Sequence, residues 1–116
     1  MTDFFSINRY ALITCPSPAL IEWVNTVFPD DPVDYSQIER EKHDEKDVFL
    51  IPEFDDVEDA LAWVKENCKT FLEQILDSWC TDEDAWPEAL DWALFERFLD
   101  YSIQSVVTDT VDEEEE

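Results

Sequence analysis

The chain has no glycine among its 116 residues. Average usage of about 7% would give roughly eight. Glycine is the residue that adopts left-handed backbone conformations without steric cost and lets the backbone approach a phosphate group closely. The absence of glycine therefore excludes the phosphate cradles that depend on it, including the P-loop and the dinucleotide-binding fingerprint.

The length and composition are those of one compact domain. A chain of 116 residues buries roughly two thirds of its unfolded surface when it folds. Hydrophobic residues make up 45% of the sequence and aromatic residues 14%, which is too apolar for a disordered acidic chain. We therefore predict a single acidic domain over residues 1–110 and a disordered acidic tail over residues 111–116, which end in Asp-Glu-Glu-Glu-Glu.

The charge balance excludes several classes of partner. The sequence has 31 acidic and 7 basic residues, which gives a net charge of −24. Affinity for DNA or RNA comes mainly from Lys and Arg, so direct nucleic-acid binding is not expected, and anionic membrane surfaces would be repelled. No apolar run approaches the roughly 18 residues of a membrane span, and the N-terminus does not resemble a signal peptide. A cytoplasmic protein is predicted.

The residues that commonly bind metals do not form a recognisable site. Cys15, Cys68 and Cys80 are odd in number and include no CxxC pair, so we expect reduced thiols without a disulfide or zinc site. Carboxylates cluster at residues 30–34, 55–59 and 82–84, but none of the clusters fits a calcium-binding EF-hand loop. Two clusters lie where helices are expected to begin, and acidic residues are favoured there by the helix dipole. We predict no metal and no cofactor.

The hydrophobic pattern predicts six main elements in the order β-α-β-α-α-β. Strands are expected at residues 9–15, 48–51 and 101–108. The first helix is expected to begin at Ser17 and Pro18 and to end at Phe28. A second helix of about six turns is predicted over residues 57–79, with Asp55 and Glu58 forming a capping box. Pro87 is expected in the first turn of a third helix.

These elements predict an α+β domain with a small three-stranded mixed sheet packed against three main helices. The first two strands are expected to be parallel, joined by a right-handed crossover. The last strand is expected to lie between or beside them and to run antiparallel. The helices would cover one face of the sheet and bury most of the apolar residues.

The strongest functional signal is a carboxylate-rich helical face in the second half of the chain. From Thr70 to the C-terminus there are fifteen acidic residues and one basic residue, Arg97. Such a face favours association with a basic partner, and exposed tryptophans act as anchors in protein interfaces. The alternative for the tryptophans is that they only close the core. The predicted partner-binding residues are Asp82, Glu83, Asp84, Trp86, Glu88, Asp91 and Trp92.

We therefore predict a small non-catalytic protein that binds a basic protein partner. Its carboxylates could imitate a phosphate backbone, as in nucleic-acid mimics and immunity-type inhibitors, an analogy that concerns charge alone. A purely solubilising role for the acidic face and a homodimer through exposed aromatic residues or the polar face of the last strand are left open. The sequence favours this function over an enzyme.

The alternative hypothesis is a thiol-dependent redox enzyme or sensor that uses Cys15. This residue is expected at the end of the first strand, just before the N-terminus of a helix, where the helix dipole stabilises a thiolate. His43, the single histidine, lies in the polar segment 41–46. A general base needs a structured and partly dry environment, so a catalytic triad with His43 is not predicted.

Overall fold

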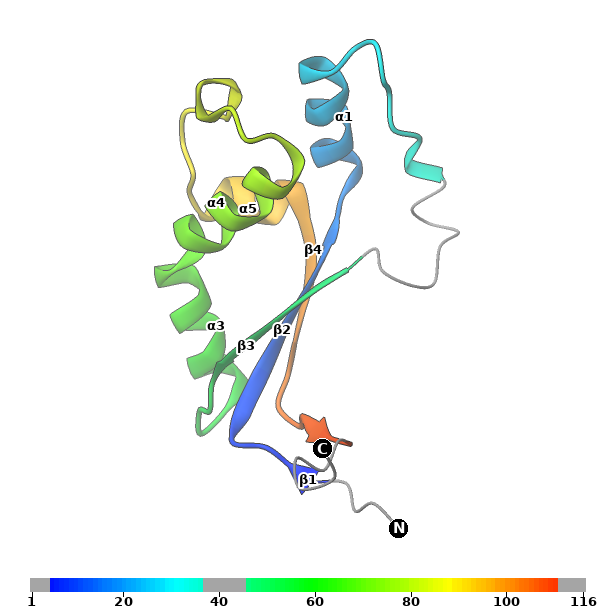
Figure 1. The fold of residues 1–116 in the computed structure, drawn as a ribbon. Coiled ribbons are helices and arrows are strands. Elements are labelled where there is room, and N and C mark those ends of the chain that lie inside the picture. Colours follow the sequence, from blue (N-terminus) through cyan, green and yellow to red (C-terminus); the bar gives the residue numbers. More distant parts are fainter. Residues whose placement is uncertain (1–4, 37–45, 111–116) are drawn as a thin grey trace.

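The computed structural model describes residues 5–36 and 46–110, which form an α+β domain as predicted (Figure 1). The strands are β1 (Phe5–Ser6), β2 (Arg9–Pro16), β3 (Asp47–Pro52), β4 (Leu99–Gln104) and β5 (Thr108–Asp109). The helices are α1 (Pro18–Val27), α3 (Val57–Glu66), α4 (Cys68–Trp79), the 3-10 helix η1 (Glu83–Ala85) and α5 (Trp92–Phe98). The predicted acidic tail and His43 lie outside the described residues.

The central strand β2 pairs antiparallel with both of its neighbours, in the order β3-β2-β4. Thr14 of β2 lies opposite Asp47 of β3 and Tyr101 of β4. The prediction of a mixed sheet with a parallel first pair is therefore wrong. A parallel pair needs a connection that returns the chain across the sheet. Instead, α1 contacts α5 at the end of β2, and the chain enters β3 from that same end (Figure 1).

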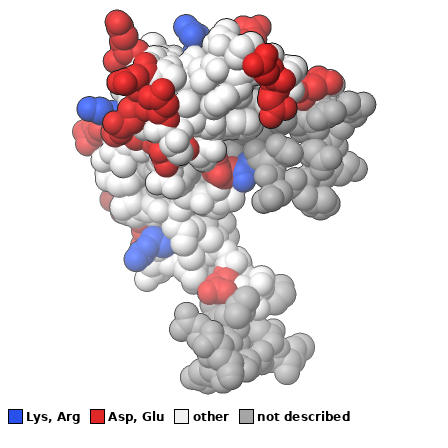
Figure 2. Space-filling view, turned by 45° about the horizontal axis from the view of Figure 1, so that its top comes forward, with Lys and Arg blue, Asp and Glu red and all other residues white. Residues whose placement is uncertain are grey.

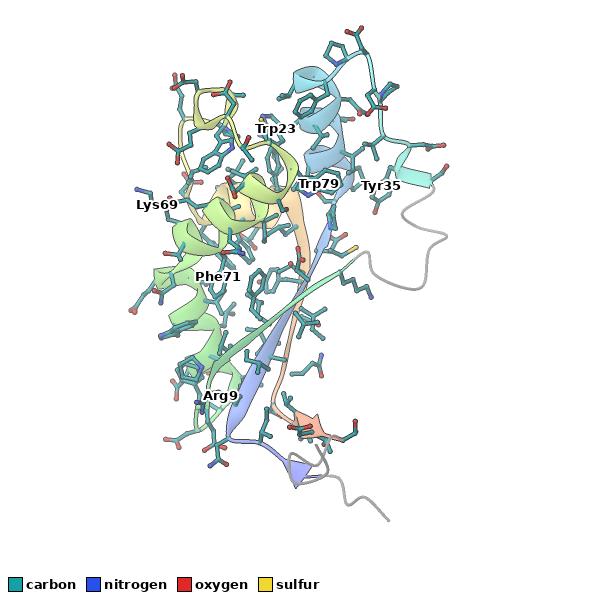
Figure 3. All side chains as sticks on the ribbon, in the orientation of Figure 1. Arg9, Trp23, Tyr35, Lys69, Phe71 and Trp79 are labelled. Carbon is teal, nitrogen blue, oxygen red and sulfur yellow. The ribbon has the colours of Figure 1, made fainter. Side chains whose placement is uncertain are left out.

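Helices α3, α4 and α5 lie against one face of the sheet and enclose the core. Leu12 of β2 and Ile51 of β3 are buried on this face. Phe71 points from α4 toward the sheet (Figure 3), and its ring lies 5.1 Å from that of Phe49. On the two outer strands, residues of the opposite parity, such as Leu50, face away from the helices and are exposed. An antiparallel sheet tolerates such a solvated face because its connections do not have to cover it.

The predicted helix over residues 57–79 is divided into α3 and α4 at Asn67. The Asn67 side-chain amide donates to the Trp63 carbonyl at 2.8 Å, and its backbone N–H is shared between the Trp63 and Val64 carbonyls. The side-chain amide of asparagine thus competes with the regular backbone hydrogen bonds of the helix. The apolar positions on both sides keep their spacing, which is why the sequence pattern resembles that of one continuous helix.

The N-cap of α3 is shifted by one residue from the predicted position. The Asp56 carboxylate accepts a hydrogen bond from the backbone N–H of Asp59 at 2.9 Å, whereas Asp55 and Glu58 form no such cap. Two neighbouring aspartates offer the same chemistry, and Asp56, whose backbone is extended, is the cap.

The third predicted helix begins later than Pro87. Asp91 caps α5 by accepting a hydrogen bond from the Leu94 N–H at 3.0 Å, and the helix begins at Trp92. An aspartate N-cap accepts a hydrogen bond from a free N–H group of the first helical turn. Proline in that turn only removes one such N–H group and adds no hydrogen bond. The segment between η1 and Asp91 is irregular.

The last strand of the sheet both begins and ends earlier in the sequence than predicted. β4 starts at the buried Leu99 and ends at Gln104 rather than running over residues 101–108. Beyond it, Thr108 and Asp109 form β5, which pairs antiparallel with β1 in a separate two-stranded sheet. None of the helices in the described ranges is both long enough and apolar enough to span a membrane.

Candidate protein-binding surface

The predicted partner-binding residues begin in a short turn after α4. Asp82, Glu83 and Asp84, which we call the acidic turn, are all exposed. The Asp82 carboxylate accepts a hydrogen bond from the Asp84 backbone N–H at 3.1 Å and so caps η1. The Asp82 side chain is therefore partly engaged in structure, while the Glu83 and Asp84 carboxylates extend from the turn into solvent.

Two tryptophans fix the position of the acidic turn. The Trp86 indole N–H donates to the Cys80 carbonyl at 2.8 Å, which closes the turn against the end of α4. The Trp23 indole N–H, from α1, donates to the Ala85 carbonyl at 3.3 Å. Both indoles are half-buried. The acidic turn is thus held on a rigid support, which lowers the entropic cost of binding through it.

The acidic turn carries uncompensated negative charge. Its three carboxylates form no ion pair with any other residue that the structure describes. Glu88 and Asp91 follow on the same irregular segment and are also exposed, although the Asp91 carboxylate serves as the α5 cap. Asp and Glu side chains gather in patches at the end of the molecule that carries α1 and η1, where Lys and Arg are scattered (Figure 2).

Trp92 belongs to a different set of contacts from Trp86. Its ring stacks on Phe95 at 4.8 Å and meets Tyr101 edge-on at 5.5 Å. The ammonium group of Lys65 lies 5.5 Å from the centre of the Trp92 ring. Trp86 and Trp92 are both half-buried and pack against the core, which favours the alternative that they close it, and their role as partner anchors stays a prediction.

The structure adds residues that the sequence could not assign to this surface. Trp23 is distant in the chain, and no sequence signal links its indole to the acidic turn. Arg97 lines an open pocket of about 320 Å³ together with Pro87 and Asp91. The guanidinium also lies 5.3 Å from the Phe98 ring. A basic residue therefore lies at the border of the segment that follows the acidic turn.

Cys15 lies away from the acidic turn, near the end of β2. It is half-buried, opposite Asp100 of β4 in the sheet register. It lines an open pocket of about 330 Å³ with Lys46 and Ser102. An ammonium group near a thiol favours the thiolate, whereas a carboxylate opposes it. Cys68 and Cys80, in contrast, are buried.

Within residues 5–36 and 46–110, no group of three or more His, Cys, Asp or Glu side chains is arranged to share a metal ion. Comparisons of the chain with protein-family models, with curated proteins and with solved structures give no match. The functional argument therefore depends on the geometry and charge of the surface itself.

Proposed function

We propose that the protein is a non-catalytic binding protein that engages a basic protein partner through the acidic turn and the exposed carboxylates after it. The observation that carries this proposal is that Glu83 and Asp84 are exposed, without an ion pair among the described residues, on a turn fixed by two indole hydrogen bonds. A fixed group of unpaired carboxylates attracts a cationic surface and sets its orientation.

A nucleic-acid mimic or an immunity-type inhibitor is the form of this function that the charge favours. In both cases the protein occupies the basic surface with which the partner binds nucleic acid. Association would be fast and would weaken with rising salt, because long-range attraction between exposed charges is screened over about 10 Å at 0.1 M salt.

The test is an affinity capture with three forms of the chain. The first is native, and the second has Glu83→Gln, Asp84→Asn and Glu88→Gln, which remove charge without touching the Asp82 and Asp91 caps. The third has Asp55→Asn, Glu58→Gln and Glu66→Gln, three exposed carboxylates on or next to α3 and away from the acidic turn. Each form is immobilised, incubated with lysate of the source cells and eluted with a salt gradient, and the eluted proteins are identified by mass spectrometry.

The native chain and the third form should retain the same basic protein, and the second form should retain it about tenfold more weakly. Equal loss in the second and third forms would show that total charge, and not the acidic turn, controls binding. If no protein is retained by the native chain and released by salt, the acidic surface has a solubilising role and the proposal is wrong.

A thiol-dependent role of Cys15 is the second candidate, favoured by the pocket that Cys15 shares with Lys46. If Lys46 stabilises the thiolate, Cys15 should react with iodoacetamide at neutral pH faster than free cysteine does. The rate is measured over a pH series by peptide mass spectrometry, with Cys15→Ser as the blank. A rate equal to or below that of free cysteine would eliminate this candidate.

A further inference from the structure

The sheet face that the helices leave uncovered contains the open pocket of about 330 Å³ beside Cys15. The residues that line it come from β2, from β4 and from the position just before β3, and they are Ile13, Cys15, Lys46, Asp100, Tyr101 and Ser102. Small-molecule sites in proteins have volumes of about 300–1,000 Å³. The pocket is therefore of a size that holds a small ligand.

A cation, a thiol and a carboxylate lie in one row across this pocket. Cys15 lies directly opposite Asp100 of β4, and directly opposed residues point to the same face. On the other side of β2, the last pair of the register is Thr14 with Asp47, so Lys46 follows at the level of Cys15. Neighbouring strands are about 4.8 Å apart, so Lys46 and Asp100 flank the thiol at about one strand spacing on either side.

Neither charged group of this row is neutralised by the rest of the chain that the structure describes. Lys46 and Asp100 are both exposed, and neither forms an ion pair with a described residue. Asp47 follows Lys46 directly, but it pairs with Thr14, whose side chain is buried on the face that the helices cover. Because side chains alternate along a strand, the Asp47 carboxylate belongs to that other face. The Lys46 ammonium and the Asp100 carboxylate are thus available to a ligand in the pocket.

The two charges select the chemical class of the ligand. A lysine ammonium binds a carboxylate and an aspartate binds an ammonium group, and an α-amino acid carries both. The flexible four-carbon stem of Lys46 lets its ammonium group move to meet the ligand. A zwitterion has no net charge, so the field of a chain of charge −24 does not repel it as it repels an anion. Ile13 and Ser102, opposed in the next row, offer an apolar surface and a hydroxyl to the rest of the ligand.

We propose that the pocket binds a small disulfide of the α-amino acid type, of which cystine is the simplest, and that Cys15 forms a mixed disulfide with one half of it. The Cys15 thiol loses its proton to solvent, and the thiolate attacks one sulfur of the bound disulfide. A bond forms between that sulfur and Cys15 Sγ, and the disulfide bond of the ligand breaks. The other half leaves as a thiolate and takes up a proton. The ligand is the oxidant: its departing half is reduced and Cys15 is oxidised.

This inference rests on the second candidate function, a reactive Cys15 thiol, and it does not involve the acidic turn. It adds the class of compound with which the thiol reacts. Because the product is covalent, the contacts to Lys46 and Asp100 have only to orient the disulfide for attack, and such orientation raises the rate. Cys68 and Cys80 are buried and lack this access, so the reaction is specific to Cys15.

The experiment measures how fast Cys15 of the full chain forms mixed disulfides with four probes. Cystine carries both charged groups, diacetylcystine only carboxylates, cystine dimethyl ester only ammonium groups, and bis(hydroxyethyl) disulfide neither. The salt concentration is about 0.15 M, at which fields are screened beyond about 8 Å. Peptide mass spectrometry locates the modified cysteine. Each rate is divided by the rate of the same probe with a small free thiol, which removes differences in intrinsic reactivity.

The normalised rate should be highest for cystine, about tenfold above bis(hydroxyethyl) disulfide, because each of two exposed ion pairs contributes about threefold. Attraction by net charge alone predicts a different order. The dimethyl ester is the most positive probe, so it would then react fastest with a chain of charge −24.

Two variants assign the two contacts, with every rate taken relative to bis(hydroxyethyl) disulfide so that changes in thiol reactivity cancel. Asp100→Asn should lower the relative cystine rate about threefold and leave that of diacetylcystine, which has no ammonium group, unchanged. Lys46→Gln should lower the relative cystine rate about threefold and leave that of the dimethyl ester unchanged. Asp77→Asn and Lys69→Gln, at exposed positions on α4, are the charge-matched controls and should preserve the order of the probes.

The outcomes separate this inference from the thiol candidate on which it rests. A cystine preference that each variant reduces is the expected result. If Cys15 reacts rapidly with iodoacetamide but shows equal normalised rates with all four probes, the zwitterion site is wrong and the thiol candidate stands. The same holds if the dimethyl ester is fastest in the native chain and in every variant. If Cys15 reacts with neither iodoacetamide nor cystine, both are wrong.

Discussion

The hydroxyl of Ser17 donates a hydrogen bond to the backbone carbonyl of Arg97 at 2.6 Å. The backbone N–H of Ser17 donates to the Phe98 carbonyl at 2.9 Å. Ser17 occupies the predicted N-cap position of α1, but its side chain makes no hydrogen bond to the helix itself. The residue instead joins the start of α1 to the end of α5. This connection fixes α1, and with it Trp23, relative to the acidic turn.

Ser17→Ala should lower the free energy of unfolding by about 1–2 kcal/mol, because it leaves the Arg97 carbonyl without its partner at a buried position. Thr26→Ala is the control, since the Thr26 hydroxyl also donates to a backbone carbonyl but is exposed. The control should change stability by no more than about 0.5 kcal/mol. Denaturant unfolding of both variants measures the difference, and equal losses would contradict a structural role for the Ser17 bond.

Trp86→Phe should destabilise the chain by about 1–2 kcal/mol, because the Cys80 carbonyl loses its indole donor. The matched control is Trp63→Phe. Trp63 is also half-buried and packs on Phe71 with ring centroids 6.0 Å apart, but its indole N–H has no acceptor among the described residues. Hydrogen exchange gives a second measurement. The backbone N–H of Trp86, which donates to the Glu83 carbonyl, should exchange faster in Trp86→Phe than in the control.

Thr14→Val should stabilise the protein by about 1 kcal/mol. Thr14 is 1% exposed, and its hydroxyl oxygen has no hydrogen-bond partner among the described residues. A buried hydroxyl without a partner opposes folding, and valine has nearly the same shape without the polar atom. Thr14→Ser should have the opposite effect, because it keeps the hydroxyl and removes a methyl group. A loss of stability in Thr14→Val would show that the hydroxyl has a partner, such as a buried water.

The sequence correctly predicted those strands and helices whose signals lie within a short stretch of neighbouring residues. The run from Arg9 to Cys15 and the apolar segment 48–51 are both strands of the sheet, and the helix after Ser17 begins where the proline places it. Strand direction could not be predicted in the same way. It depends on where α1 packs, and the contact between α1 and α5 joins segments far apart in the chain.

The sequence could predict which residue types make up the candidate site, but not how they are arranged in space. Acidic density identified residues 82–84, and the structure exposes all three. Whether an indole is an interface anchor or a structural clamp depends on its hydrogen-bond acceptor. For Trp86 that acceptor is a backbone carbonyl, which any residue type supplies. The placement of Lys46 and Asp100 on either side of Cys15 was likewise beyond the sequence, because strand order is a property of the assembled sheet.

Stability should fall with rising pH above about 10 through the phenol of Tyr101. Its pKa is raised above the ordinary 10.0, first by burial and second by the negative charge of Glu96. The ring lies against Trp92 and Phe95 at 5.5 Å and 5.4 Å, in surroundings that disfavour a phenolate. In the unfolded chain the phenol loses its proton at the ordinary pKa, while the folded chain retains it to higher pH.

The sign follows from proton binding. Above the unfolded pKa the folded state holds more protons than the unfolded state, so the free energy of unfolding decreases as pH rises through the folded pKa. Below pH 10 this group contributes no pH dependence. Tyr101→Phe should therefore lose less stability than the native chain over the alkaline range. Denaturant unfolding at a series of pH values, with the native tyrosinate absorbance titrated in parallel, measures both quantities. If the two stability curves stay parallel above pH 10, Tyr101 does not cause the alkaline loss.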